Sequence, residues 1–176
     1  MQDSTMVKVV PDPRFDLAPE IDEQLYAYQK EVDLQVGILG AALRSLDRKK
    51  EALSNLEQQL NAWDHPDKAR LLERIAAMRN TLEALRAKGQ TTRPKRQLGA
   101  WQTSIVTPYS KVRAIQRIAM SRTRAISMQE KQLVQEATQM VELFGNQVDT
   151  FEKTEWKPFI AQIRKAGFYM QSEKSE

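Results

Sequence analysis

Residues 25–60 read LYAYQKEVDLQVGILGAALRSLDRKKEALSNLEQQL, and this stretch decides the fold. Apolar side chains recur along it every seven residues, and a second apolar set lies three or four positions away. The first set is Leu25, Val32, Leu39, Leu46, Leu53 and Leu60, and the second is Ile21, Tyr28, Leu43, Leu56 and Trp63. A seven-residue repeat keeps one side of a long α-helix against a partner helix. We therefore expect a coiled-coil-like rod.

The rod is predicted to begin near Pro19 and to end near Ala62, a length of about 65 Å. Asp64 to Asp67 predict a tight turn, with Pro66 in the first turn of a second helix. That helix carries the same seam and stops at Gly89, so we expect it to fold back antiparallel. Its apolar positions are Leu71, Ile75, Met78, Leu82 and Leu85.

Small residues interrupt the first rod at Gly37, Gly40, Ala41 and Ala42. Each glycine costs about 1 kcal/mol relative to alanine in a helix interior. Such a patch is typical of the close approach of another helix or an aromatic ring, and a kink is the alternative.

Three further helices are predicted after the hairpin. Thr107 and Pro108 start a short helix, and Ser127 with Glu130 forms a capping box for a longer one that covers the exposed part of the rod. The apolar residues of the longer helix are Leu133, Ala137, Met140, Phe144, Val148 and Phe151. A brief aromatic helix then holds Trp156, Pro158, Phe159 and Ile163, and ends at Gly167.

The N-terminal residues 1–18 are predicted to be extended. Ser4 to Val10 is rich in β-branched residues, and the prolines Pro11 and Pro13 forbid a helix after it. A single strand has no partner in a helical chain, so we expect it to belong to a sheet whose other strands lie elsewhere. Residues 169–176 are predicted to be a frayed tail.

Composition excludes several classes of site. The 176 residues include no cysteine, which removes disulfides, thiolate nucleophiles and cysteine metal sites. The longest apolar run, Gly37 to Leu43, is too short to span a membrane, and residues 1–20 lack the pattern of a secretory signal. Neither the cytosol nor an exported location is excluded by the absence of cysteine.

Ten basic residues and no acidic residue lie between Ala84 and Gln129. The simplest interpretation is a solvated face or a charge match with the acidic helices of the same chain. A contact with an anionic partner is the alternative, and nucleic acid is the least expected one because aromatic residues are too sparse for base stacking. The candidate patch is Arg93, Lys95, Arg96, Lys111, Arg113, Arg117, Arg122 and Arg124.

No pattern typical of catalysis is present. His65 is the single histidine and lies in a helix-start turn, so capping explains it better than a metal site does. The sequence contains no phosphate-binding glycine loop, nucleophile elbow or metal motif, and we predict neither an enzyme nor a cofactor. The aromatic residues could line a pocket, but we expect them to close the ends of a bundle. They are Trp63, Trp101, Trp156, Phe144, Phe151 and Phe159.

The order of these features resembles the C-terminal region of bacterial sortilin-like, BNR-repeat glycosidase-like β-propeller proteins. The resemblance rests on Asp12-Pro13-Arg14 after a strand, on the leucine-spaced hairpin, and on the segment from Trp156 to Gly167. It implies that Ser4 to Val10 is the last strand of an immunoglobulin-like sandwich, and that the propeller lies outside this chain. It also implies an extracellular or periplasmic location, and it assigns no active-site residue to this chain.

We therefore predict an all-α elongated bundle at residues 19–168, built from an antiparallel coiled-coil hairpin and a covering C-terminal helix. The predicted role is a non-catalytic structural or interaction module, the helical tail of a secreted sortilin-like protein, whose partners are neighbouring domains or another protein. A monomer is expected. The alternative is an independent coiled-coil adaptor that self-associates along Leu25 to Leu60 or binds an anionic surface through the basic connector.

Overall fold

The computed structural model describes residues 19–64, 66–90, 106–121 and 124–168. These residues form five α-helices and one π-helical segment: α1 (Pro19–Asn61), α2 (Lys68–Gly89), α3 (Pro108–Met120), α4 (Met128–Phe151), η1 (Glu152–Trp156) and α5 (Lys157–Lys165). Within these ranges no residue is in a strand. The prediction of an all-α helical bundle is confirmed.

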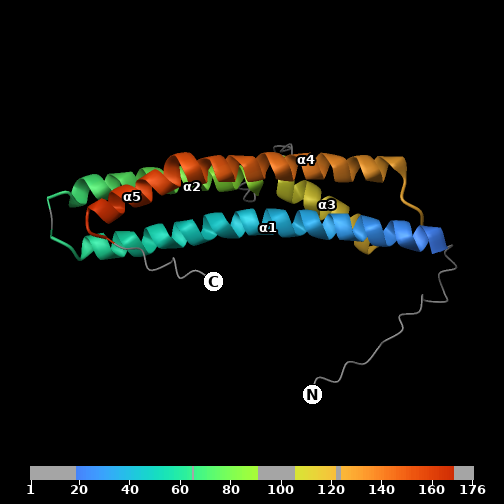
Figure 1. Ribbon diagram of the computed structural model, residues 1–176, viewed down its shortest axis with the longest axis horizontal. Helices are drawn as coiled ribbons and strands as arrows, with labels where there is room; N and C mark the ends of the chain where they lie inside the picture. Colours follow the sequence, from blue (N-terminus) through green and yellow to red (C-terminus); the bar gives the residue numbers. More distant parts are fainter. Residues whose placement is uncertain (1–18, 65, 91–105, 122–123, 169–176) are drawn as a thin grey trace, which may run out of the picture.

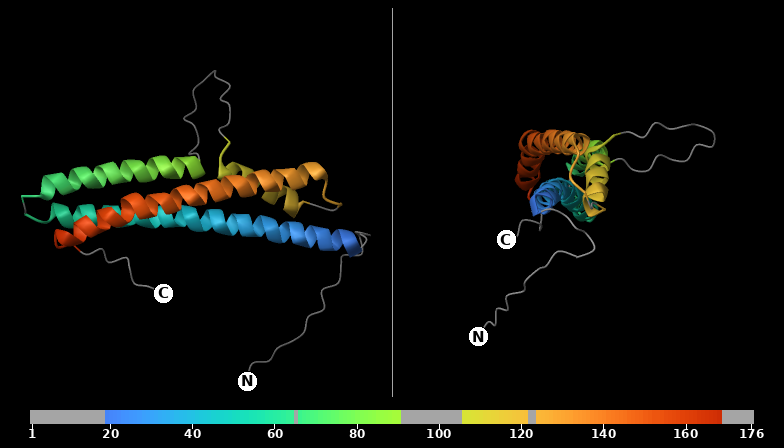
Figure 2. Two further views of the ribbon diagram at one scale, coloured as in Figure 1. Left: turned by 45° about the horizontal axis from the view of Figure 1, so that its top comes forward. Right: turned by 90° about the vertical axis from the view of Figure 1, so that its right-hand side faces the viewer.

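The helices form three long rods that lie side by side (Figures 1 and 2). α1 is the first rod. α2 and α3 follow one another along its length and make the second rod, antiparallel to α1. The third rod is α4, η1 and α5, which run parallel to α1 and continue one another without a break. α1 contacts α2, α3 and α4, so it is the element that holds the bundle together.

The predicted apolar seam of α1 is the core of the molecule. Its members from Val32 to Leu60 are buried, and Leu46 is only 1% exposed. Leu25 and Ile21, near the N-terminal end of α1, are half-buried, as is Trp63 just beyond its other end. Full burial of one leucine side chain contributes about 1.5–3 kcal/mol, so this seam is a large share of the folding free energy.

Polar cross-links confirm the antiparallel hairpin. Arg79 pairs with Glu57, Lys50 Nζ lies 2.8 Å from Glu83 Oε1, and Arg86 Nε donates to Asp47 Oδ1 at 2.7 Å. The hydrogen bond from Lys50 lowers the pKa of Glu83, and the bond to Asp47 raises the pKa of Arg86.

The hairpin turn differs slightly from its prediction. α2 begins at Lys68, so Pro66 lies in the turn and not in the first helical turn. Lys68 Nζ donates to the carbonyl oxygen of Asn61 at 2.8 Å. This bond satisfies a carbonyl at the C-terminal end of α1, where no basic residue of α1 itself is available.

The capping predictions for the later helices are confirmed. Thr107 Oγ1 accepts from the Ser110 backbone N–H, and Ser127 Oγ accepts from the Glu130 backbone N–H, each in a complete capping box. α4 covers α1 as expected, and α3 shares this task by extending the line of α2. The buried face of α4 includes Val134 and Val141, whereas the predicted Leu133 and Met140 are half-buried. The true face alternates steps of three and four residues throughout, because α4 follows a heptad repeat.

A polar layer separates two parts of the core. The larger hydrophobic cluster includes Leu39 to Leu60, and the smaller one includes Tyr28 and Val32 with residues of α3 and α4; Val36 packs against both. Gln35 lies between them, is 2% exposed, and donates from Nε2 to Glu31 Oε1 at 2.9 Å. Thr138 of α4 donates to the same carboxylate oxygen at 3.4 Å. A buried amide at one seam position disfavours other registers of the rods.

The third rod has one residue more than a regular heptad repeat would place between Phe151 and Trp156, and the wider π-helical turn of η1 accommodates it. The buried positions Val148 and Phe151 continue the heptad repeat, but the next one is Trp156, five residues later. The N–H of Lys157 accordingly bonds to the carbonyl of Glu152, a π-helical step. Pro158 follows, and because it lacks an N–H and its ring displaces the carbonyl four residues back, it disfavours a regular α-helix there. The predicted aromatic helix is therefore correct in place but is a continuation of α4.

The structural roles of Gly89, Gly37 and Gly40 differ from those predicted. Gly89 is buried at the end of α2 without a positive φ, and a Cβ there would overlap the Phe144 ring of α4. Conversely, the patch at Gly37 and Gly40 receives no helix or ring among the described residues: a Cβ at Gly37 would meet no atom within 4 Å, and one at Gly40 would meet only the Arg44 side chain. Gly167, with φ 87°, follows the end of α5 as predicted.

Several predictions fall outside the described residues. These are the extended segment 1–18 with its strand Ser4 to Val10, the tail 169–176, His65, Trp101, and the basic residues Arg93, Lys95, Arg96 and Arg122.

Replacing Gly89 with alanine should destabilise the bundle by about 1–3 kcal/mol, because the new methyl group displaces the Phe144 ring. Gly37→Ala is the matched control. It should stabilise α1 by about 0.5–1 kcal/mol, since the site has room for a methyl group and glycine is a poor helix former. Urea unfolding followed by circular dichroism measures both, and equal effects of the two substitutions would contradict the packing described.

Leu46→Asp should cost several kcal/mol, because it places an unpaired carboxylate at a position that is 1% exposed. Leu143→Asp, on the outer side of α4 at 62% exposure, should change the free energy of unfolding by about 0.5 kcal/mol or less. Unfolding of the Leu46 variant at the wild-type temperature would refute the seam.

Candidate interaction groove

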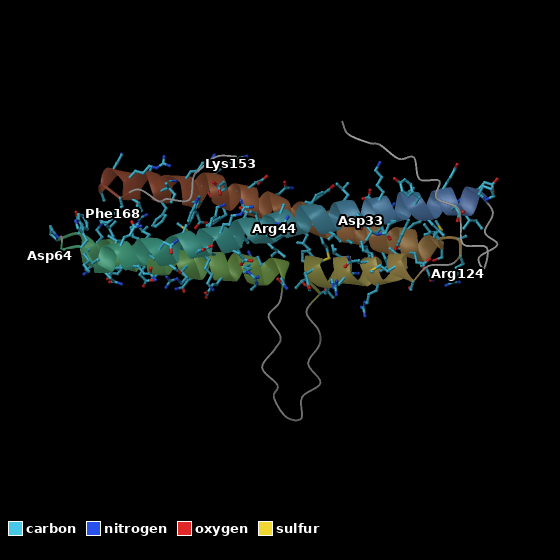
Figure 3. All side chains as sticks on the ribbon, turned by 90° about the horizontal axis from the view of Figure 1, so that it is seen from below. Asp33, Arg44, Asp64, Arg124, Lys153 and Phe168 are labelled. Carbon is cyan, nitrogen blue, oxygen red and sulfur yellow. The ribbon has the colours of Figure 1, made fainter. Side chains whose placement is uncertain are left out.

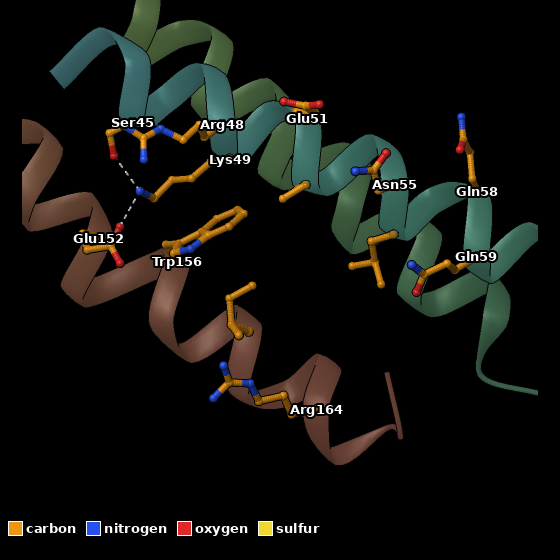
Figure 4. Close-up of a pocket in the computed structure, with 13 residues that line it drawn as sticks. Ser45, Arg48, Lys49, Glu51, Asn55, Gln58, Gln59, Glu152, Trp156 and Arg164 are labelled. Carbon is orange, nitrogen blue, oxygen red and sulfur yellow. Dashed lines mark hydrogen bonds and ion pairs between the residues drawn. The ribbon is translucent and has the colours of Figure 1, made fainter. Parts of the chain in front are cut away.

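A groove of about 800 Å³ runs between α1 and the rod formed by η1 and α5 (Figure 4). On the α1 side it is lined chiefly by polar or small residues, and on the other side by Glu152, Trp156, Ile160 and Arg164. The α1 residues are Ser45, Arg48, Lys49, Glu51, Ala52, Asn55, Leu56, Gln58 and Gln59.

Lys49 is the centre of the polar network in the groove. Its Nζ lies 2.7 Å from Glu152 Oε2 and donates to Ser45 Oγ at 2.8 Å (Figure 4). It also lies 5.7 Å from the centroid of the Trp156 ring, within the range of a cation–π contact. The Lys49 side chain is only 13% exposed, so these contacts replace most of its hydration.

The groove lies where the second apolar row of α1 is interrupted. In steps of seven from Tyr28 to Leu56, the intervening positions are Gln35, Ala42 and Lys49, and of these only Lys49 lines the groove. There its side chain meets Glu152 and Trp156 of η1 in place of a large apolar residue. Ser45 and Ala52 widen the gap because their side chains are short. A reader of the sequence could find this site by asking which heptad positions are not apolar.

The Ser45 and Lys49 pair has the composition of a serine–lysine dyad, but its surroundings favour a structural role. In such a dyad the serine hydroxyl gives its proton to the lysine, whereas here Lys49 Nζ donates to Ser45 Oγ and is also paired with Glu152. Ser45 also lies in the middle of α1, where backbone N–H groups are engaged in the helix and cannot form an oxyanion hole. Lys49 therefore serves to join α1 to η1.

The structure brings together only part of the predicted basic patch. Lys111 Nζ lies 2.6 Å from Glu136 Oε2, and Arg113 donates to Gln116 Oε1 at 2.9 Å. Arg117 and Arg124 are exposed, and Figure 3 shows Arg124 at the end of the bundle opposite Asp64 and Phe168. The match between Lys111 and an acid of α4 agrees with the interpretation that the chain neutralises some of its own basic charge.

The predicted aromatic residues lie mainly in the core. Phe144, Phe151 and Phe159 are buried, and Trp63 meets Phe168 edge to face with centroids 4.4 Å apart at one end of the bundle. Trp156 is the exception, because it is buried against Phe159 and also lines the groove.

Within the described part of the chain, no group of three or more histidine, cysteine, aspartate or glutamate side chains could hold a metal ion. Among the described helices, none combines the length and the hydropathy of a membrane-spanning segment.

No protein-family model, curated protein or solved structure matches this chain.

The Lys49–Glu152 pair should contribute more to stability than the exposed Lys50–Glu83 pair. A double-mutant cycle with Lys49→Met and Glu152→Gln should give a coupling energy of about 1–2 kcal/mol, because both groups are partly buried. The cycle with Lys50→Met and Glu83→Gln is the control, and water and salt should screen its coupling to a smaller value. Chemical unfolding at two salt concentrations measures both coupling energies. A Lys49–Glu152 coupling no larger than the Lys50–Glu83 coupling would contradict a structural role for Lys49.

Proposed function

We propose that this chain is a non-catalytic helical module that holds neighbouring domains or a protein partner. The observation that carries the proposal is that the apolar seams of all three rods meet inside one chain. Such a bundle is a stiff body of about 65 Å, the length of α1, and it offers long helical faces to a partner.

The chemistry of the groove supports the same conclusion. The lysine and the carboxylate there neutralise each other, and the serine accepts a hydrogen bond from the lysine. The remaining lining residues are mainly amides and long charged side chains, which are suited to recognition of a polar surface.

The more specific role, that of the helical tail of a sortilin-like propeller protein, stays a proposal that rests on the resemblance alone. The alternative is an independent adaptor. Burial of Val32 to Leu60 within the chain favours a monomer over a dimer that shares this seam, because the same side chains cannot serve both interfaces.

Sedimentation velocity combined with small-angle X-ray scattering tests the module. We expect an elongated monomer whose longest dimension reflects the length of α1, with no change in mass as concentration rises. A compact sphere, or a dimer that dissociates only when the Leu46 seam is disrupted, would contradict the proposal.

Binding to an anionic surface is the second candidate function, and the exposure of Arg113, Arg117 and Arg124 favours it. If it holds, retention of the chain on vesicles that contain anionic lipid should fall steeply between low and moderate salt. Charge reversal at Arg113 and Arg117 should reduce retention further. Retention that is weak at low salt, or that does not depend on these residues, would exclude this candidate.

A further inference from the structure

Two large apolar residues of α1 lie outside the core, on the side of the helix that also carries the groove. Leu34 is 53% exposed and Ile38 is 41% exposed, and Ala41 beside them is exposed as well. They lie one helical turn apart, so they form a continuous apolar ridge. No described element covers this ridge.

The ridge leads directly into the groove. From Leu34 the positions on this side of α1 follow alternating steps of four and three residues: Leu34, Ile38, Ala41, Ser45, Arg48, Ala52, Asn55 and Gln59. The last five of these line the groove. Alternating steps of three and four residues create the holes that a partner helix fills. The row spans about 38 Å at the rise of an α-helix.

The opposite wall is α4, and its register with α1 is known from two contacts. Thr138 bonds to Glu31, and Glu152 pairs with Lys49. Gly145 lies midway between these contacts on α4, and a Cβ on it would meet no described atom within 4 Å. We call the surface formed by Leu34, Ile38 and Ala41 of α1 and Gly145 of α4, together with the groove into which it leads, the trough.

The two walls carry opposite charge. Arg44 and Arg48 are exposed on α1, with Arg44 near the middle of the bundle (Figure 3). Glu142 and Asp149 are exposed on α4 one turn from Gly145, at the outer edge of the same side. Between Leu34 and Arg48 the α1 wall is thus basic and the facing part of α4 is acidic, whereas farther along the groove Glu51 of α1 and Arg164 of α5 carry the opposite signs.

We propose that this trough binds an amphipathic helix of a partner polypeptide, whose apolar ridge packs on Leu34 and Ile38. The helix carries acidic residues on the flank that meets Arg44 and Arg48, and basic residues on the flank that meets Glu142 and Asp149. Its addition completes a four-helix bundle, in which an apolar ridge with charged flanks gives both affinity and orientation. This inference rests on the proposed function and names the partner class.

Charge is the feature that selects this occupant. An anionic lipid surface or nucleic acid would be repelled by Glu142 and Asp149, and a wholly acidic or wholly basic helix would meet one wall of like charge. A helix with one acidic and one basic flank can place each flank against the wall of opposite charge when it binds in one of its two directions.

Three synthetic peptides of about four heptads test the proposal. All share one leucine and isoleucine ridge. The first has glutamate on one flank and lysine on the other, the second has glutamate on both flanks, and the third has lysine on both. Fluorescence anisotropy with dilute labelled peptide should give micromolar binding for the first, and binding about tenfold weaker for the other two. A peptide with its two flanks exchanged would not be a control, because it could bind in the opposite direction. The peptides with uniform flanks are therefore the controls.

Variants of the full chain locate the contact. Leu34→Glu with Ile38→Glu should weaken binding of the mixed peptide by about tenfold or more, while Leu143→Glu on another face of α4 should leave it unchanged. Glu142→Lys with Asp149→Lys makes both walls basic and should shift the preference to the glutamate peptide. All these positions are exposed, so circular dichroism should confirm a wild-type fold.

The inference is overturned if the wild-type chain binds none of the peptides, binds all three equally, or loses no affinity in the Leu34 and Ile38 variant. The inference would also be overturned if the wild-type chain dimerises and the Leu34 and Ile38 variant does not, because a second copy of the chain would then occupy the trough. If any of these results is obtained while the chain is elongated in solution, the inference fails and the proposed function stands. A compact body, or a dimer held by the Leu46 seam, contradicts the proposed function itself.

Discussion

Burial of the α1 seam is the interaction on which the whole structure depends. α1 has 43 residues and α2 has 22, so the return arm of the hairpin can cover only half of it. Exposed leucines over the remaining length would cost more free energy than the chain could recover elsewhere. α3 solves this by continuing the line of α2, and α4 with η1 and α5 closes the third side along nearly the whole length.

The local irregularities all serve that burial. Gly89 ends α2 without a side chain, so the Phe144 ring of α4 can pack directly against the end of α2. η1 inserts one residue before Pro158, which returns Trp156 and Phe159 to the core after the heptad repeat has lost its phase. Gln35 sits at the boundary between the two apolar clusters and relates α1 to α4 through Glu31 and Thr138.

The surface with potential for recognition follows from the same rods. Where α1 departs from an apolar heptad, at Lys49, its contact with η1 becomes polar, and the groove lies there. Where apolar residues fall beside the seam and not within it, at Leu34 and Ile38, they stay exposed. A bundle of three rods thus leaves one side on which a fourth helix would find apolar, acidic and basic residues in register.

The amino-acid sequence alone determined the helices, their caps and the seam, because heptad spacing, capping boxes and proline act over a few neighbouring residues. It could not place α3 in line with α2, since that depends on which rod buries the uncovered leucines. Nor could it reveal why Gly89 is glycine, that Gly37 and Gly40 meet no partner helix within the described chain, or that Lys49 and Glu152 meet across 103 positions. Those features were decided by tertiary structure, because they are contacts between rods and only the packed bundle sets the distances between them.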